Sequence, residues 1–480
     1  MHQGGTGSTT DEIVNAAGCG LFQHFIFLWV SLNWLGIGCA FNVAAFVAWG
    51  AKCELVLSLT QESWILNITY VGSILGSFFW GIVADEVGRK PVGVAHMLMA
   101  LVGGFGAALL HSGFWPMLVC RFIVGFSIPG NLMSMPLLLE FSPVKWRGLG
   151  PALASFAWVF SALYVTGAGW LVLDRGFRYL VLLTLLPLVM ALMQSCYIPE
   201  TPHQLLVRGR RYGAEAVLEK LSKYNGRGLI VPSNWSLTPV TPKARGRGKL
   251  RSAWKGISAL FCPTLRKVTF LIWTIWLVQS MVYGALVILT NDVFPTHEPD
   301  CHQDRVDMSD YKYTRMAIIT SAEVVGIGLS LLMIESVGRK WPILGGFVLN
   351  AIGLLPMIIP MPIHRYSAPL FIARTGWAAT FVLTMVYTSE FYPTEIRGIG
   401  TGTASGISAV GWVISRQLAK ILVDEWSRQG VAAILTVIAL AGAIATIWLP
   451  KDAKGRELED VIPSDEPTTP LLEPPPENGA

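Results

Sequence analysis

Charged residues are scarce in this sequence. Only 14% of its 480 residues are Asp, Glu, Lys or Arg, against roughly 25% in soluble domains, while 52% are hydrophobic. A composition this apolar excludes soluble enzymes and nucleic-acid-binding proteins as the default class. We therefore expect a protein that crosses the lipid bilayer many times and has no nucleic-acid partner.

The sequence also lacks motifs for cleavable targeting, nucleotide binding and metal binding. The first twenty residues contain no Lys or Arg, so we expect no cleavable signal peptide. Residues 398–406 resemble a phosphate loop, but no strand precedes them, and their small side chains suit the close packing of membrane helices. Residues 297–302 contain metal-ligand types, but Pro299 interrupts them. We expect no metal, no cofactor and no enzymatic activity.

Long apolar runs, by contrast, recur throughout the chain. A helix needs about 20 residues to cross the hydrocarbon, and its backbone must be fully hydrogen-bonded there, so these runs predict an all-α membrane protein with twelve transmembrane helices. The predicted spans are 21–48, 64–84, 92–112, 115–139, 149–173, 177–198, 268–290, 314–334, 341–361, 367–389, 398–422 and 430–449. The predicted parts are an N-terminal segment 1–20, a six-helix bundle 21–198, a basic linker 199–267, a second six-helix bundle 268–450 and a disordered tail 451–480.

The distribution of Lys and Arg predicts the orientation. The even-numbered connections between spans, together with the C-terminal tail, carry 24 of them, and the odd-numbered connections carry 6. Because basic residues are retained on the cytoplasmic side, we expect both termini to be cytoplasmic. The linker is the most basic part, and it either binds anionic lipid, at about 1 kcal/mol per charge, or is solvated. The plasma membrane and an intracellular vesicle both remain open as the location.

Seven cysteines are present, and two of them fall in predicted outward loops. Cys53 follows the first span, and Cys301 lies between the seventh and eighth. Only this pair would meet an oxidising exterior or lumen, which makes it the candidate disulfide. A reduced pair is the alternative.

Two sequence phrases occur twice at a constant spacing. Residues 140–148 (EFSPVKWRG) return at 390–398 (EFYPTEIRG), and residues 85–90 (DEVGRK) return at 335–340 (ESVGRK), both 250 positions later. Two independent phrases with one offset predict a duplicated structure, as in transporters built from two related bundles.

The repeated phrases place acids and bases at the predicted cytoplasmic ends of helices. If their ion pairs form only when those ends close, they bias the equilibrium between inward-open and outward-open states. A static belt of ion pairs is the alternative. The candidate gating residues are Asp85, Arg89, Glu140, Arg147, Glu335, Arg339, Glu390 and Arg397.

Several further phrases resemble a known family. They are residues 20–23, 121–125, 139–141, 199–202, 310–311, 321–323, 387–394 and 454–458. With these phrases the chain resembles the major facilitator superfamily, specifically its branch of synaptic vesicle 2-related proteins and organic ion transporters. The resemblance implies twelve helices in two pseudo-symmetric bundles. Its Pro199-Glu-Thr-Pro202 phrase, similar to a sugar-porter motif, adds Glu200 to the gating candidates.

The chain departs from that branch at three helix positions and in its final motif, which is degraded at residues 450–455 (PKDAKG). Ile37 and Ala40 stand where related proteins carry acids on the first helix, and Ala409 stands where an arginine is common on the eleventh. Because of these departures, the cargo of related proteins cannot be assigned to this chain, and whether it transports a solute is itself in question.

Charged residues at membrane depth cost about 3 kcal/mol or more and need a reason. Glu323 lies near the middle of the eighth predicted span, where such transporters hold cargo, and either contacts solute or protons or pairs with a packing arginine. Arg121 and Arg374 are expected structural braces, and the stem of Arg416 could extend to the interface. The other candidate substrate-binding residues are polar or aromatic: Asn42, Tyr70, Asn131, Gln279, Tyr283 and Trp377, with Trp158 and Trp412 as further aromatic candidates.

These features predict a transporter of a small organic solute that works by alternating access, either facilitative or coupled to a proton or sodium ion. A transport-silent protein of the same fold, acting as a binding partner on a vesicle or cell surface, is the alternative.

Overall fold

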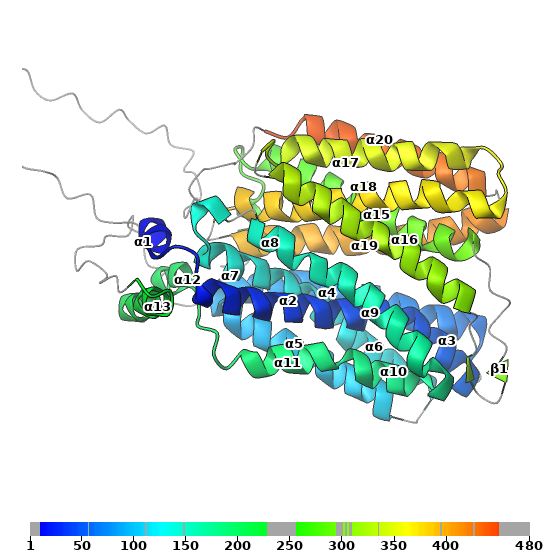
Figure 1. Cartoon of the computed structure of the whole chain (residues 1–480), viewed down its shortest axis with the longest axis horizontal. Coiled ribbons are helices and arrows are strands. Elements are labelled where there is room, and N and C mark those ends of the chain that lie inside the picture. Colours follow the sequence, from blue (N-terminus) through cyan, green and yellow to red (C-terminus); the bar gives the residue numbers. More distant parts are fainter. Residues whose placement is uncertain are drawn as a thin grey trace, which may run out of the picture.

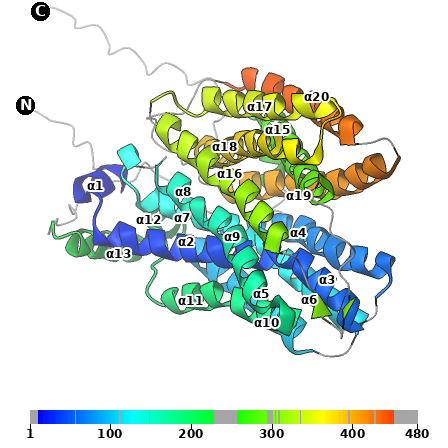
Figure 2. The same cartoon turned by 45° about the vertical axis from the view of Figure 1, so that its right-hand side comes forward.

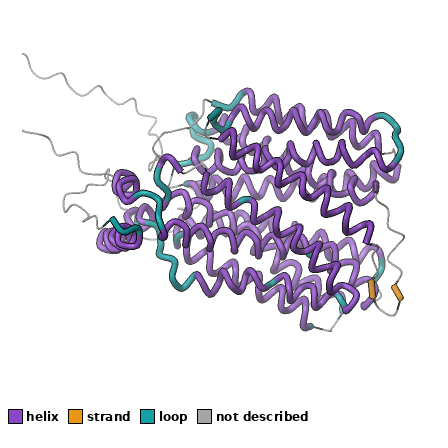
Figure 3. Tube along the Cα trace, viewed as in Figure 1, coloured by secondary structure: helices purple, strands orange, loops and turns teal. Residues whose placement is uncertain are grey.

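The computed structural model describes residues 10–55, 57–110, 113–146, 149–227, 256–293, 301–302, 305–306, 310–334, 336–393, 396–425 and 428–450. These residues form a bundle of long helices and one small antiparallel sheet of β1 (Cys301–His302) and β2 (Arg305–Val306) (Figures 1 and 3). The first half of the chain occupies the lower part of Figure 1 and the second half the upper part.

Each predicted span coincides with a helix or with helices that follow one another. In the first half these are α2 (Leu21–Asn42) with α3 (Ala44–Leu55), α4 (Leu59–Val87), α5 (Arg89–Leu109), α6 (Phe114–Ser127) with α7 (Ser134–Phe141), α8 (Leu149–Ala154) with α9 (Phe156–Val172), and α10 (Phe177–Thr184) with α11 (Leu186–Gln194). In the second half they are α15 (Arg266–Val293), α16 (Asp310–Ile334), α17 (Lys340–Leu354), α18 (Ser367–Phe391), α19 (Arg397–Glu425) and α20 (Arg428–Ile447). Short 3₁₀ helices η1 (Ile128–Met133), η2 (Val144–Trp146), η3 (Leu173–Arg175), η4 (Leu355–Ile358) and η5 (Ile363–Tyr366) connect or extend them.

By length and composition, 11 helices of the described part could cross a membrane. The remaining predicted span is α19, a continuous helix of 29 residues whose first half is rich in Gly, Ser and Thr. The helices also extend beyond several predicted ends. For example, α4 begins five residues early, because Ser58 and Gln61 form a capping box that satisfies its first amides.

Three helices outside the spans pack together at one end of the molecule. They are α1 (Thr10–Ala17), α12 (Pro202–Val207) and α13 (Arg211–Tyr224), which share a small core that includes Val14, Leu206 and Leu218. We call this the linker end, at the left in Figure 1, and the opposite end, with α3 and β1, the far end.

The two halves meet along two pairs of helices: α4 packs along α19, and α9 packs along α16 (Figure 2). Glycines make the first contact close. A Cβ on Gly402 would lie 2.6 Å from the Ser77 carbonyl oxygen, and one on Gly81 would lie 2.7 Å from the carbonyl oxygen of Gly398. The interpretation of residues 398–406 as a helix-packing segment is thus confirmed.

A glycine contact of the same kind within the first half gives a stability prediction. A Cβ on Gly125 of α6 would overlap the Thr69 carbonyl of α4, whereas one on Gly167 of α9 would meet nothing within 4 Å. We expect Gly125→Ala to cost about 1–3 kcal/mol through overpacking. Thermal unfolding in detergent should show a Tm several degrees lower for Gly125→Ala and a nearly unchanged Tm for Gly167→Ala. Equal Tm values would contradict this packing.

Candidate functional site

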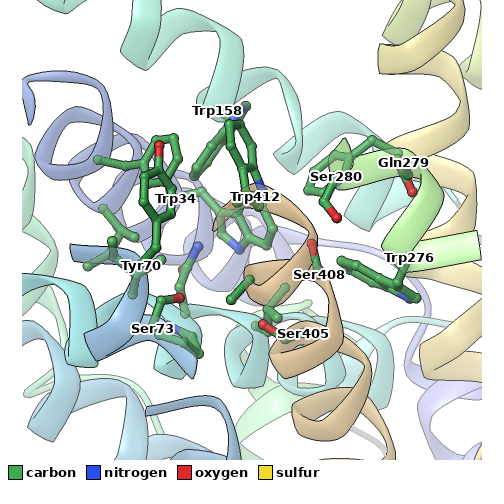
Figure 4. A pocket seen from close by; sticks show the side chains of 18 of the residues that line it. Trp34, Tyr70, Ser73, Trp158, Trp276, Gln279, Ser280, Ser405, Ser408 and Trp412 are labelled. Atoms are coloured by element: carbon green, nitrogen blue, oxygen red, sulfur yellow. The ribbon is translucent and has the colours of Figure 1, made fainter. Parts of the chain in front are cut away.

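A cavity rich in aromatic residues lies between the two halves (Figure 4). The space between the lining residues, with the opening to the outside included, is about 760 Å³. The aromatic lining comes from both halves and comprises Trp34, Phe41, Tyr70, Trp158, Trp276, Trp377, Phe381 and Trp412. Such a lining presents flat apolar faces with negative π surfaces, which suit planar or cationic organic groups.

No charged residue is among the residues that line this cavity in the described part of the chain. Ile37 and Ala409, two of the positions at which the family resemblance leads one to expect a charged residue, are themselves in the lining. The polar groups there are serine hydroxyls, the Tyr70 hydroxyl, tryptophan N–H groups and two amides, those of Asn131 and Gln279. Both side-chain polar atoms of Gln279 and the Oδ1 of Asn131 are buried without a hydrogen-bond partner among the described residues. Since an unsatisfied buried amide is costly, these groups are candidates to bind a ligand.

A break in the fourth membrane-spanning unit places Asn131 at the cavity. Pro129 cannot donate a backbone hydrogen bond, and the chain from Ile128 to Met133 tightens from α-helix to the 3₁₀ helix η1. This segment contributes Ile128, Pro129, Asn131 and Leu132 to the lining.

The aromatic rings make a continuous wall across the two halves. Tyr70 of α4 stacks on Trp412 of α19, with centroids 5.7 Å apart (Figure 4). Trp412 packs edge-on against Tyr283 of α15 at 5.1 Å, and Tyr283 stacks on Trp377 of α18 at 3.6 Å. A change at any of these rings is therefore passed to its neighbours by direct contact.

Glu323 of α16 lies behind this wall and not in the lining. Its side chain is fully buried, and its Oε1 accepts a hydrogen bond from the Tyr283 hydroxyl at 2.9 Å. The same oxygen lies 3.3 Å from Nη1 of Arg374 on α18, so the predicted arginine partner is present. Direct contact between Glu323 and cargo stays a prediction.

The other predicted substrate residues fall into two groups. Tyr70, Asn131, Gln279 and Trp377 line the cavity. Asn42 and Tyr283 are not among the lining residues, and the Asn42 amide donates to the Ser161 hydroxyl at 3.0 Å. Arg121 donates to the backbone carbonyl of Ala40.

Four of the predicted gating residues meet at the linker end and join the halves. Oε1 of Glu140 on α7 lies 3.4 Å from Arg89 of α5 and 3.2 Å from Arg397 of α19, and all three side chains are buried. The Asp85 carboxylate, at the end of α4, accepts hydrogen bonds from the backbone N–H of Gly398 at 3.0 Å and of Ile399 at 2.8 Å. These are first-turn amides of α19, where a carboxylate is stabilised by the helix dipole. We call Asp85, Arg89, Glu140 and Arg397 the charge cluster.

The second half repeats one pair of the charge cluster. Arg339 donates to both oxygens of Glu390 at 3.0 and 2.9 Å, at positions equivalent to Arg89 and Glu140. This pair lies within one half and does not cross the interface. Two other gating candidates, Arg147 and Glu335, lie outside the described residues. The side chains of Cys53, Cys301 and Arg416 are not described, so the predicted Cys53 to Cys301 pairing stays a prediction.

Glu200 supports the charge cluster from the linker. Its Oε1 accepts hydrogen bonds from the backbone N–H of Arg89 at 3.2 Å and of Thr201 at 3.0 Å. Burial raises the pKa of the Glu200 carboxyl, an effect that the backbone amides of Thr201 and Lys90 and the Arg89 charge partly offset. The Glu200 carboxyl therefore holds the backbone at Arg89 in place.

Comparison with known proteins assigns the family. The family model of sugar (and other) transporters matches residues 39–463. The chain belongs to this family. It is therefore an integral, multi-pass membrane protein that moves a solute across the bilayer, and the predicted superfamily membership is confirmed.

Relatives and solved structures agree with this assignment. The organic cation/carnitine transporter 7 of Arabidopsis thaliana is 26% identical, over 96% of this chain and 98% of its own. The synaptic vesicle 2-related protein of Xenopus laevis is 27% identical, over 94% of this chain and 82% of its own. The proton:xylose symporter XylE, solved with 6-bromo-6-deoxy-D-glucose, matches with a TM-score of 0.72 at 17% identity, over 92% of this chain and 98% of that one. The predicted twelve-helix major facilitator fold is thus confirmed, and the transport-silent alternative is not favoured.

Proposed function

We propose that the protein carries a small organic solute in the aromatic cavity and works by alternating access. The observation that carries the proposal is the pairing of an interfacial cavity with a charge cluster that joins the two halves at the linker end. In the conformation described, this cluster closes the linker end, which we take as the cytoplasmic side. Breaking it would let α4 and α19 separate there and open the cavity to that side.

The lining supports a flat or cationic organic solute. Eight aromatic residues supply stacking and cation–π surfaces, and beside them the lining has only two amides and four serines, which favours a flat or cationic solute over a polyol. The name of the Arabidopsis relative, an organic cation/carnitine transporter, agrees with an organic cation. Because the lining has no carboxylate, the aromatic faces would have to supply the attraction to a positive charge.

A ligand screen tests the proposal. The purified protein would be screened by thermal shift against organic cations, organic anions, planar neutral heterocycles, sugars and nucleotides, and each hit followed by flux into liposomes. We expect at least one planar or cationic compound to bind the wild-type protein. It should bind Trp412→Ala at least about tenfold more weakly than wild type, since the ring supplies about 1–2 kcal/mol of cation–π or stacking energy.

The matched control is Trp115→Ala, because Trp115 is 72% exposed on α6, away from the cavity. It should keep wild-type affinity and flux. A hit that binds Trp412→Ala as well as wild type would place the cargo elsewhere. A compound that binds the protein but is not transported into liposomes would favour the alternative function as a binding partner.

A further inference from the structure

The structure points to Glu323 as the group that takes up and releases the coupling proton, with Tyr283 transmitting its charge state to the cavity wall. This inference rests on the proposed function, because a coupling proton requires a transported solute. It changes the role of Glu323 from a cargo contact to a proton site behind the cargo cavity. Four observations support it.

The first observation is the asymmetric use of the Glu323 carboxylate. Its Oε1 holds both partners, the Tyr283 hydroxyl at 2.9 Å and the Arg374 guanidinium at 3.3 Å. Its Oε2 is buried and has no hydrogen-bond partner among the described residues, and the same is true of the Nε of Arg374. A fully satisfied structural ion pair would use these atoms. The unpartnered oxygen is instead the place where a proton can bond.

The second observation is direct contact between this pair and the cavity wall. The Arg374 guanidinium lies over the Tyr283 ring, 5.4 Å from its centroid. The same ring stacks on Trp377 and meets Trp412 edge-on, and both tryptophans line the cavity. A change at Glu323 therefore reaches a bound solute through two rings in contact.

The third observation is the charge environment of Glu323. Of the helices packed around it, α18 contributes Arg374 and α15 contributes Tyr283, and α4 contributes Tyr70, which is part of the aromatic wall. The neighbouring helices α8 and α9 contain no charged residue. Arg315, two turns earlier on α16, donates to the Ser367 hydroxyl. Protonation of Glu323 thus leaves one buried cation, Arg374, without a counterion nearby.

The fourth observation is the different partner of the equivalent arginine in the first half. Arg121 sits at the position equivalent to Arg374, but its guanidinium donates to the backbone carbonyl of Ala40. Among the described membrane helices, the Glu323 and Arg374 pair is consequently the ion pair next to the cavity, while the charge cluster lies at the linker end.

The step is a simple proton transfer. A proton from water in the open cavity bonds to Oε2 of Glu323, and the carboxylate becomes a neutral carboxylic acid. The charge–charge attraction to Arg374 is lost, the hydrogen bond from the Tyr283 hydroxyl to Oε1 weakens because its acceptor is now a neutral carbonyl oxygen, and the Tyr283 ring is held less firmly against Trp377 and Trp412. Release of the proton on the other side restores the ion pair. No oxidation or reduction takes place.

Two measurements on the full-length protein test the inference. In lipid films, a pH jump from 8 to 5 followed by difference infrared spectroscopy should show a carboxylic acid band in wild type that is absent in Glu323→Gln and shifted in Glu323→Asp. The control is Glu54→Gln, because Glu54 pairs with Arg178 near the far end and should keep the band. A band that persists unchanged in Glu323→Gln overturns the inference without using any cargo.

The second measurement follows flux of a hit from the ligand screen in liposomes. An imposed proton gradient should accelerate uptake by wild type and by Glu54→Gln at least tenfold more than uptake by Glu323→Gln, which should still exchange the solute. Flux that is insensitive to the proton gradient, or driven by a sodium gradient, overturns proton coupling while leaving the transport proposal intact. Absence of flux in every variant contradicts the transport proposal, and the infrared result then still decides whether Glu323 titrates.

Discussion

Glu140→Gln is expected to destabilise the protein by about 3–5 kcal/mol and to open the linker end. Glu140 is the carboxylate shared by Arg89 and Arg397, and all three side chains are buried. Removing its charge leaves two buried guanidinium groups with less compensation, which costs more than the loss of the ion pair alone. Because one of those arginines belongs to each half, part of this cost is relieved when the linker ends separate.

Two readouts check this expectation. The Tm in detergent should fall, and Ser405→Cys, in the cavity lining, should react faster with a membrane-impermeant maleimide added from the linker side. The matched control is Glu390→Gln, which removes the equivalent acid of the second half. It should also lower the Tm, but leave the reactivity of the cavity cysteine unchanged, because Arg339 and Glu390 belong to the same half. Equal reactivity in both variants would contradict a gate at Glu140.

Gly402→Leu should hold the halves apart at the linker end without unfolding the protein. A Cβ at this position lies 2.6 Å from the Ser77 carbonyl oxygen of α4, so a leucine side chain has no room when α4 and α19 are in contact. The clash disappears when the two helices separate, and we therefore expect a folded protein that has lost most of its transport. The loss should be at least tenfold in flux.

The control for Gly402→Leu is Gly345→Leu on α17, where an added Cβ meets nothing within 4 Å. It should retain both Tm and flux. Gly402→Ala should be intermediate, because a methyl group needs a smaller separation. Wild-type flux in Gly402→Leu would mean that α4 and α19 need not close during the cycle.

The membrane helices and the internal duplication could be predicted from the sequence because both are local patterns. Apolar runs define the spans, and the offset of 250 residues correctly related Arg89 with Glu140 to Arg339 with Glu390. The role of Asp85 was not foreseen in detail. It binds backbone amides at the start of α19, 313 positions away, and no side-chain pattern reports on such an interaction.

The cavity was only partly predicted, for a physical reason. A membrane helix buries one face against its neighbours and another against lipid, and both faces are apolar, so the sequence does not show which tryptophans point inward. Trp34, Phe41, Trp276 and Phe381 were therefore not among the candidates, although they line the cavity. Glu323 was selected correctly as a buried charge, but its position behind Tyr283 depends on the packing of α15, α16 and α18.

The packing of the linker against the N-terminal segment was also not predicted. Asn225, at the end of α13, accepts a hydrogen bond from the Phe22 backbone N–H and donates to the Gly18 carbonyl. These partners are about 200 residues apart, and the predicted boundaries at residues 20 and 199 treat them as separate parts. The composition of a polar segment does not indicate where it docks.

The measurement that tests alternating access most directly is a pair of spin-label distances at opposite ends of the molecule. Labels at Lys145 and Val337 report on the linker end, and labels at Leu110 and Ile359 report on the far end. In Glu140→Gln, relative to wild type, we predict a longer distance at the linker end together with a shorter one at the far end. A longer linker-end distance with an unchanged far end would mean local opening, and would contradict a rocking movement of the two halves around the cavity.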